Sequence, residues 1–207
     1  RLADRERVVV VKGLAEREVY ADKVTWPLVY KELGNDPAEI YRRIETKNTI
    51  VTQFLRENGI SDNEISISAP KVLDRFANSW SQENIDDRYV ATSVIIVSSR
   101  NVGQVRSAIQ MQPQLMKKGV AIISEEYGSN AVVYEFTGLN TIKPEMIEES
   151  TKNARAAAQQ FAKDSDSELG KIRRASQGQF SIVDRDGNTP HIKNVRVVST
   201  VEYYICD

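Results

Sequence analysis

Hydrophobic and polar residues alternate along much of the first part of the chain. Val8 to Val11 is a short β-branched run that ends at Gly13, and we interpret it as a strand. From Glu18 to Leu33, Val, Tyr, Thr and Trp alternate with other residues, which predicts one long strand. Pro27 lies inside this stretch and has no N–H to donate, so we place it at an edge or a bulge. A strand of that length must bend or project beyond its domain.

The next segment has the pattern of an amphipathic helix. Asp36 can accept hydrogen bonds from the free N–H groups at its start, and Pro37 suits its first position. Asn58-Gly59 provides the stop signal, because glycine adopts the left-handed conformation at little cost. The apolar positions that share one face are Ile40, Ile44, Val51 and Leu55.

A strand and a boundary follow this helix. Residues 65–69 alternate and predict a strand, which Pro70 interrupts and residues 72–80 continue. Residues 81–88 are mostly polar and predict a loop. We therefore expect a domain boundary there.

Residues 88–175 predict a second unit with six elements in the order strand, helix, strand, strand, helix, strand. The strands are expected at 89–97, 120–123, 131–136 and 171–175, with a hairpin turn at 128–130 and helices at 102–118 and 144–163. Ser99 or Asn101 can cap the first helix, and Pro113 should kink or end it. This order is that of the ferredoxin-like, split βαβ pattern.

Strands return at the end of the chain. Residues 180–183 lead to a tight turn at Asp186-Gly187, and residues 195–204 alternate strongly. This terminal strand needs a sheet to join, and the first group of elements is its natural host. We therefore predict an α+β fold in which residues 1–87 and 176–207 form a discontinuous sheet-plus-helix domain. The second predicted domain is a ferredoxin-like βαββαβ domain of residues 88–175, which is inserted into the first.

Composition narrows the function classes. The chain has 207 residues and a formal net charge of -1, which argues against nucleic acid or an anionic membrane as the main partner. One Cys and one His exclude the usual zinc sites and a disulfide framework. No apolar run is long enough to span a bilayer. The chain begins at Arg1, so we expect processing or truncation, with any signal peptide or membrane anchor in the removed N-terminal segment.

Few residues offer catalytic chemistry. His191 follows Pro190 beside a turn, where a surface position is the commoner role, and Ser176 or Ser181 would need a base to become a nucleophile. The single Cys206 is a candidate for pairing between chains, although an inert terminal thiol is the simpler interpretation. We therefore predict no catalytic residue and no enzyme activity.

Carboxylates gather in two places. Asp164, Asp166 and Glu168 alternate with serines, while Asp184 and Asp186 flank an arginine. Such groups could hold calcium, but neither segment matches an EF-hand loop. The carboxylates are equally typical of the solvated end of a helix, for the first segment, and of a turn, for the second. The glycines form no phosphate-binding motif. We therefore predict no metal site and no cofactor site.

Several segments, taken in order, resemble the SIMPL-domain family. They are residues 8–13 and 19–22, which carry V-x-G and A-D, then 55–65, the Ala-rich 153–162 with 169–172, and the terminal strand 195–205. The resemblance covers nearly the whole chain and implies a two-part α+β fold with a discontinuous first domain. The family includes bacterial periplasmic immunogenic proteins and proteins linked to oxidative-stress defence.

Three function hypotheses remain, of which the least favoured is an enzyme that uses carboxylates or His191. The first is a non-enzymatic periplasmic or cell-envelope protein that self-associates through the long strands of its first domain, and that contributes to envelope or oxidative-stress protection. By resemblance, ring-like homo-oligomers follow from such strands. The alternative is a module that binds a small ligand or a peptide in a cleft between the two predicted domains.

Overall fold

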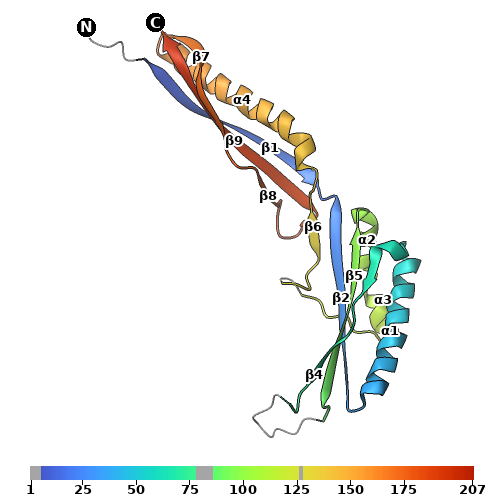
Figure 1. The fold of residues 1–207 in the computed structure, drawn as a ribbon. Coiled ribbons are helices and arrows are strands. Elements are labelled where there is room, and N and C mark those ends of the chain that lie inside the picture. Colours follow the sequence, from blue (N-terminus) through green and yellow to red (C-terminus); the bar gives the residue numbers. More distant parts are fainter. Residues whose placement is uncertain (1–5, 78–85, 126–127) are drawn as a thin grey trace. The chain divides into compact units, whose positions relative to one another are not determined.

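The computed structural model describes residues 6–77, 86–125 and 128–207. The chain divides into two units, of which the first comprises residues 1–21 and 136–207 and the second residues 22–135. Each unit contains one antiparallel sheet with helices against one face (Figure 1). The predicted α+β class is therefore confirmed.

The sheet of the second unit is built on two long central strands. β2 (Lys23–Gly34) pairs antiparallel with β5 (Tyr89–Ser99). On its far side, β5 pairs with β3 (Ile65–Ile67) and β4 (Lys71–Asp74). β6 (Val133–Glu135) pairs with the beginning of β2. Beyond β6, no further strand of the described residues pairs along the outer edge of β2, where Ile123 makes a single bridge to Val29.

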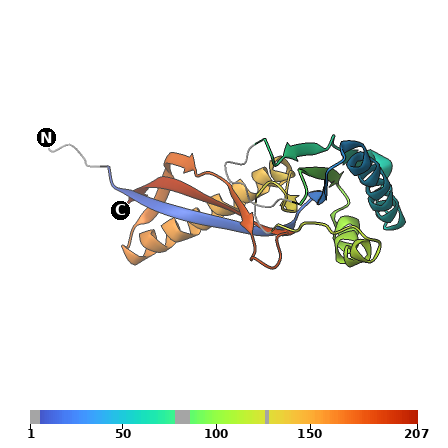
Figure 2. The ribbon, with the colours of Figure 1, turned by 90° about the horizontal axis from the view of Figure 1, so that it is seen from below.

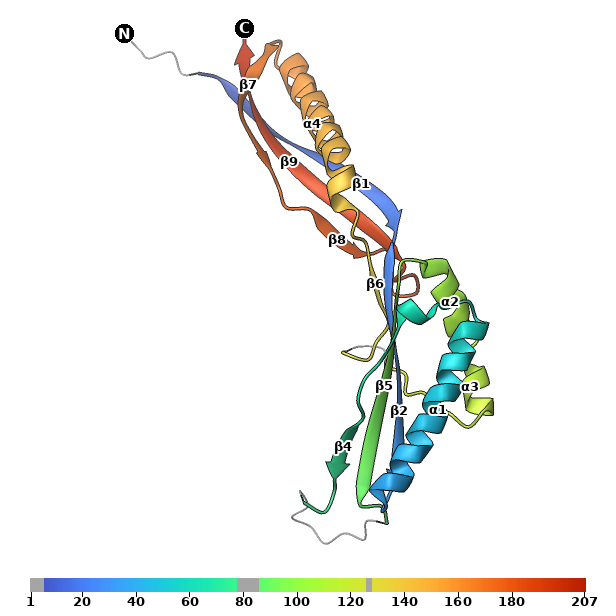
Figure 3. The ribbon, with the colours of Figure 1, turned by 45° about the vertical axis from the view of Figure 1, so that its right-hand side comes forward.

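Three helices cover one face of this sheet, as Figure 3 shows: α1 (Pro37–Glu57), α2 (Val102–Gln110) and α3 (Pro113–Lys117). The even-numbered residues of β2 from Val24 to Glu32 face them and are buried. In the middle of the strand Pro27 and Val29 are buried as well, so residues 26–30 are covered on both faces. The 3-10 helix η1 (Asp62–Glu64) follows α1. The largest fully buried side chains of this core are Trp26, Leu28, Tyr30, Phe54, Leu55, Ile95 and Leu115.

The local signals for these helices are confirmed. The Asp36 side chain accepts a hydrogen bond from Ala38 N at 3.0 Å, and Gly59 after α1 has φ +83°. The Asn101 side chain caps α2 by accepting from Gln104 N at 3.2 Å. α2 ends at Gln110, and Pro113 begins α3, because a proline is readily accommodated at the first position of a helix.

The sheet of the first unit consists of β1 (Val8–Tyr20), β9 (Ile192–Cys206), β7 (Glu168–Gln177) and β8 (Ser181–Asp184). β9 lies in the centre, with β1 on one side and both β7 and β8 on the other. α4 (Leu139–Asp164) runs along one face, which the orange helix in Figure 2 shows from below. Pro144, predicted to begin this last helix, lies inside α4 instead. Buried residues under α4 include Val11, Ala15, Val197, Val201 and Tyr203.

Small residues bring α4 unusually close to β1. Ala154 and Ala158 are fully buried on the helix, and a Cβ at Gly13 would lie 1.9 Å from Ser150 O. Only glycine fits at that position of the strand. Gly13 therefore does not end the strand, as the sequence suggested, but lets the helix lie against it.

The single long strand expected from Glu18 to Leu33 is wrong. The chain changes sheet after β1: Ala21 N donates to His191 O at 2.8 Å in the first unit, and Asp22 N donates to Glu135 O at 2.8 Å in the second. One peptide bond separates these two hydrogen bonds. A uniform alternation of residues carries no sign of such a change, because both strands have the same period.

As predicted, a discontinuous first unit contains an inserted second unit, but the ferredoxin-like fold expected for the insertion is wrong. β5 and β6 belong to the sheet of the second unit and β7 to that of the first, so the strands of residues 88–175 do not form one sheet. The expected strand at 120–123 makes only a bridge from Ile123 to Val29. The boundaries of the two units accordingly differ from 1–87, 88–175 and 176–207. The expected continuation of β4 through 78–80 and most of the loop at 81–88 lie outside the described residues, as do residues 126–127 before the expected turn.

Among residues 6–77, 86–125 and 128–207, no helix is both long enough and apolar enough to cross a bilayer.

Candidate functional site

The outer edge of β1 carries backbone groups that pair with no strand among the described residues. Arg7 O accepts from Ile205 N at 2.9 Å, so odd-numbered residues of β1 bond to β9 and even-numbered residues point away from it. Asn153 Nδ2 of α4 donates to Leu14 O at 2.7 Å, which agrees with this direction. β1 is therefore a long edge strand with an open hydrogen-bonding side.

The same even-numbered residues place their side chains on the face opposite α4. Three of them are large and apolar: Val10 is 58% exposed, Leu14 38% and Tyr20 74%. The others are charged apart from Val8, namely Lys12, Glu16 and Glu18. Charges and the Asn153 cap protect the middle and the end of the strand, which is the usual defence of an exposed edge. The stretch from Val8 to Lys12 has the weakest protection.

A cavity of about 280 Å³ opens on this face beside Val10. Its other lining residues are Arg174, Ser176, Thr200 and Glu202. Ser176, one of the serines considered as a nucleophile, lies here opposite Thr200. His191 precedes β9 and is nine residues from Thr200, or about 30 Å along an extended strand. The structure therefore does not bring this serine and the histidine together.

Ser181 is also placed away from His191. Ser181 begins β8 and pairs with Arg196, five residues and roughly 15 Å along the strand from the histidine. Cys206 is exposed at the end of β9, opposite Glu168. The candidate residues Ser176, Ser181, His191 and Cys206 therefore do not form one shared site.

The clustered carboxylates are held by local partners. Asp164 accepts from Gln160 Nε2 at 2.8 Å, and Asp184 pairs with Lys193. A hydrogen bond from the Thr189 side chain, with one from Asn188 N, lowers the pKa of Asp186. Across the described ranges, no group of three or more His, Cys, Asp or Glu residues is arranged to hold a metal ion.

A comparison with protein families decides the classification. The model of the family described as SIMPL, protein of unknown function (DUF541), matches residues 9–200. The chain belongs to the SIMPL family. No curated protein matches the chain. Two of the sequence motifs that carry the family resemblance have a physical reason in this SIMPL domain. The glycine of V-x-G, Gly13, lets α4 pack closely against β1, and the A-D motif, Ala21-Asp22, is where the chain passes from one sheet to the other.

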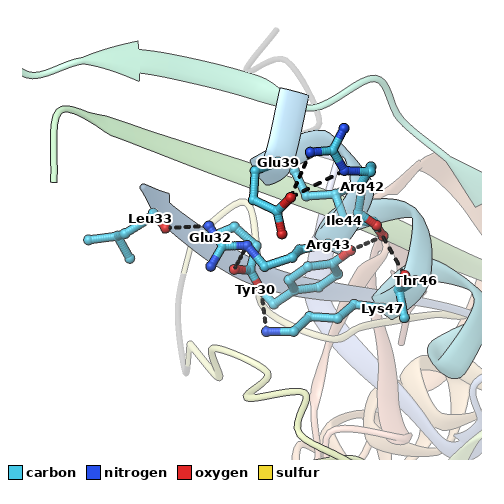
Figure 4. A network of polar contacts seen from close by, with 9 residues as sticks. All are labelled: Tyr30, Glu32, Leu33, Glu39, Arg42, Arg43, Ile44, Thr46 and Lys47. Carbon is cyan, nitrogen blue, oxygen red and sulfur yellow. Dashed lines mark hydrogen bonds and ion pairs between the residues drawn. The ribbon is translucent and has the colours of Figure 1, made fainter. Parts of the chain in front are cut away.

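The second unit of this SIMPL domain contains a buried charge that the sequence reasoning missed. The Glu32 side chain is 7% exposed on β2 and faces α1, where Lys47 Nζ contacts Glu32 Oε1 and Arg43 Nε lies 3.7 Å from Glu32 Oε2 (Figure 4). Arg43 Nη2 also donates to Leu33 O at 2.9 Å, which caps the outer edge of β2. Arg43 Nε is buried and has no acceptor within hydrogen-bonding distance.

A buried tyrosine lies beside this carboxylate on the same strand. The Tyr30 hydroxyl contacts Ile44 O at 3.0 Å and Asn48 Oδ1 at 2.5 Å. Burial raises the pKa of Tyr30, a hydrogen bond with Ser93 opposes the shift, and the charge of Glu32 adds to it. The hydroxyl is therefore protonated at neutral pH and can donate a hydrogen bond.

One sequence signal could have identified the network. Glu32 follows Trp26, Leu28 and Tyr30 in the buried phase of β2, so its carboxylate needs a cation nearby. Arg43 and Lys47 are four residues apart on α1 and therefore share a helix face.

Proposed function

We propose that this SIMPL-domain protein is a non-enzymatic protein of the bacterial cell envelope that self-associates through the outer edge of β1. The observation that carries the proposal is the row of outward N–H and C=O groups from Val8 to Lys12, next to the exposed Val10. An exposed edge of this kind is a template for another strand. A second copy of β1 supplies the same length and the same pattern.

The capped carbonyl at Leu14 suggests a register for this pairing. Because Asn153 already binds Leu14 O, pairing of two β1 strands is expected to centre on Val10, with Val8 of one protomer opposite Lys12 of its partner. An antiparallel pair with this register has twofold symmetry, and from Val8 to Lys12 it places no like charges opposite each other. The two Val10 side chains would then cover each other's exposed apolar surface.

The test is light scattering coupled to gel filtration, with and without reductant. The Val10→Pro variant removes an outward N–H and leaves the hydrogen bonds of β1 to β9 in place, because Val10 points away from β9. The matched Val10→Thr variant retains the N–H and the branched shape. Circular dichroism verifies that both variants fold.

We expect an oligomer for the wild type and for Val10→Thr, unaffected by reductant, and a monomer for Val10→Pro. A wild type that stays monomeric at the highest concentration overturns the proposal. So does an oligomer that disappears on reduction, because Cys206 would then be the link. An oligomer that persists in Val10→Pro rejects the β1 edge.

The envelope part of the proposal rests on the family's periplasmic and stress-defence members, and it needs a cellular test. Fractionation of cells that make the full-length protein should recover it from the envelope, and recovery with cytoplasmic markers contradicts the location. Peroxide survival of a deletion strain, complemented with wild type or with Val10→Pro, tests whether self-association supports protection. Equal survival with both contradicts that link.

A further inference from the structure

An open cavity of about 360 Å³, a depression of the surface, lies on the second unit beside the Glu32 network. Four of its lining side chains are cationic: Arg42, Arg43 and Lys47 from α1, and Lys118 directly after α3. Glu39 is its one acidic lining residue within the described part of the chain. The lining therefore has a marked excess of positive charge, in a protein whose formal net charge is -1.

The negative charges nearby do not cancel this excess. Glu39 Oε2 already accepts from Arg42 Nε at 3.2 Å and from Arg42 Nη2 at 2.7 Å. Glu32 lies behind Arg43 and Lys47 and is buried, so it faces the helix rather than the cavity. Lys118 Nζ lies 3.6 Å from Glu57 Oε2, so a third carboxylate is near the cavity. Four cations against these three carboxylates still leave a net positive charge of one.

The structure also fixes the position of Arg43. Its guanidinium binds Leu33 O and lies against Glu32, as Figure 4 shows. A Cβ at Gly34 would lie 2.8 Å from Arg43 Nη2, so glycine at that position leaves the room that the guanidinium occupies. Binding to a cation held in place loses less conformational entropy than binding to a freely moving one.

The chemistry of this lining suits one class of ligand. Two guanidinium groups can each offer two parallel N–H donors to the oxygens of a phosphate, and ammonium groups add point charges. The volume lies at the lower end of that of small-molecule sites, which suits a compact ligand. Ile50 supplies an apolar wall beside the charges.

We propose that this cavity binds a phosphate-bearing ligand, held by Arg42, Arg43, Lys47 and Lys118. The phosphate belongs either to a soluble organic phosphate or to a phospholipid headgroup. This site is separate from the β1 edge and does not depend on self-association.

The test uses variants that leave the buried network intact. The double variant Arg42→Gln/Lys118→Gln removes two exposed cations of the cavity, whose side chains are 62% and 43% exposed. The matched control, Arg56→Gln/Lys117→Gln, removes one exposed cation from α1 and one from α3 outside the cavity lining. Both variants change the net charge of the full-length chain equally.

Isothermal titration with pyrophosphate at low ionic strength is the first arm. We expect saturable binding by the wild type that weakens as salt is added, an affinity reduced about tenfold or more in the cavity variant, and a change of less than about twofold in the control. No saturable binding by the wild type overturns the proposal unless the vesicle arm below is positive. Equal losses in both variants overturn it outright, since net charge alone would then explain the binding.

Cosedimentation with vesicles forms the second arm and separates the two sources of phosphate. Binding to phosphatidylglycerol vesicles that the cavity variant loses and the control retains assigns a lipid headgroup. Binding of pyrophosphate without binding to vesicles assigns a soluble phosphate. Absence of binding in both arms refutes the site.

Discussion

Gly13→Ala is the substitution with the largest expected effect on the first unit. The added Cβ would lie 1.9 Å from Ser150 O and 2.4 Å from Ala154 N, both backbone atoms of α4. No side-chain rotation relieves such contacts, so the helix must move by about 1 Å or more, enough to forfeit a quarter to a half of each contact's dispersion energy. Overpacking of this kind destabilises proteins by about 1–3 kcal/mol, and sometimes by more.

The movement also disturbs two hydrogen bonds between α4 and the sheet. Ser150 Oγ and Ser199 Oγ are 2.6 Å apart, and Asn153 Nδ2 lies 2.7 Å from Leu14 O. At about 1 kcal/mol for each bond, the total destabilisation of the first unit reaches about 3–5 kcal/mol. For a unit of this size, that lowers the melting temperature by roughly 15 °C or more.

The two units need separate probes, because the chain need not unfold in one step. Trp26 is fully buried in the second unit, and both tryptophans of the chain fall within residues 22–135, so the fluorescence change of Trp26 on unfolding reports on this unit. Hydrogen exchange of α4 peptides reports on the first, while circular dichroism reports on both units together. We expect Gly13→Ala to lose protection in α4 while the tryptophan transition in urea stays unchanged.

The matched control is Gly187→Ala, in the turn between β8 and β9 of the same unit. A Cβ there meets nothing within 4 Å. We expect a change of at most about 0.5 kcal/mol. If Gly13→Ala keeps the α4 protection and the unfolding midpoint of this control, the tight approach of α4 to β1 is refuted.

Three further predictions concern single polar contacts. Ser199→Ala leaves Ser150 without its buried partner and should destabilise the first unit by about 1 kcal/mol; an unchanged thermal transition by circular dichroism contradicts this. Glu32→Gln removes a buried charge whose two cations stay partly solvated, so the urea midpoint by tryptophan fluorescence should fall by the equivalent of about 1–3 kcal/mol, and a rise contradicts it. The hydrogen bond from Arg88 holds the pKa of Asp74 below its usual 3.8, so this pair stabilises the folded state above that value, and the stabilisation is lost as pH falls through the folded pKa. Asp74→Asn should therefore destabilise the protein at pH 7 and much less at pH 3, and an equal effect at both values rejects the pair's role.

The elements that depend on local signals were predictable from the sequence. The cap at Asp36, the stop at Gly59 and the break at Pro113 act on their own backbone neighbours, so each lies where the residues indicated. The edge position of Pro27 also agrees with the register, because Val29 O, two residues along, accepts from Ile123 N outside the main pair of strands.

The pairing of the strands was not predictable in the same way. The order of elements from 88 to 175 is that of a ferredoxin-like unit, yet β5 and β7 find partners far away in sequence. The partner of a strand depends on the complementarity of whole sheets, which one strand's pattern does not specify. The β1 edge was missed because Gly13 looked like an end, and its true role depends on α4, which lies beyond residue 138.

The change of sheet at Ala21-Asp22 has a consequence for the order of folding. The second unit is one continuous segment, whereas β1 and β9 of the first meet only after the chain has closed a loop that contains the whole of residues 22–135. Once the second unit has folded, the bond from Asp22 N to Glu135 O holds the two ends of that segment together. The remaining search for β1 then resembles the closure of a much shorter loop, and short loops close at a lower entropic cost. We therefore expect the second unit to fold first, and β1 to pair with β9 in the first unit afterwards.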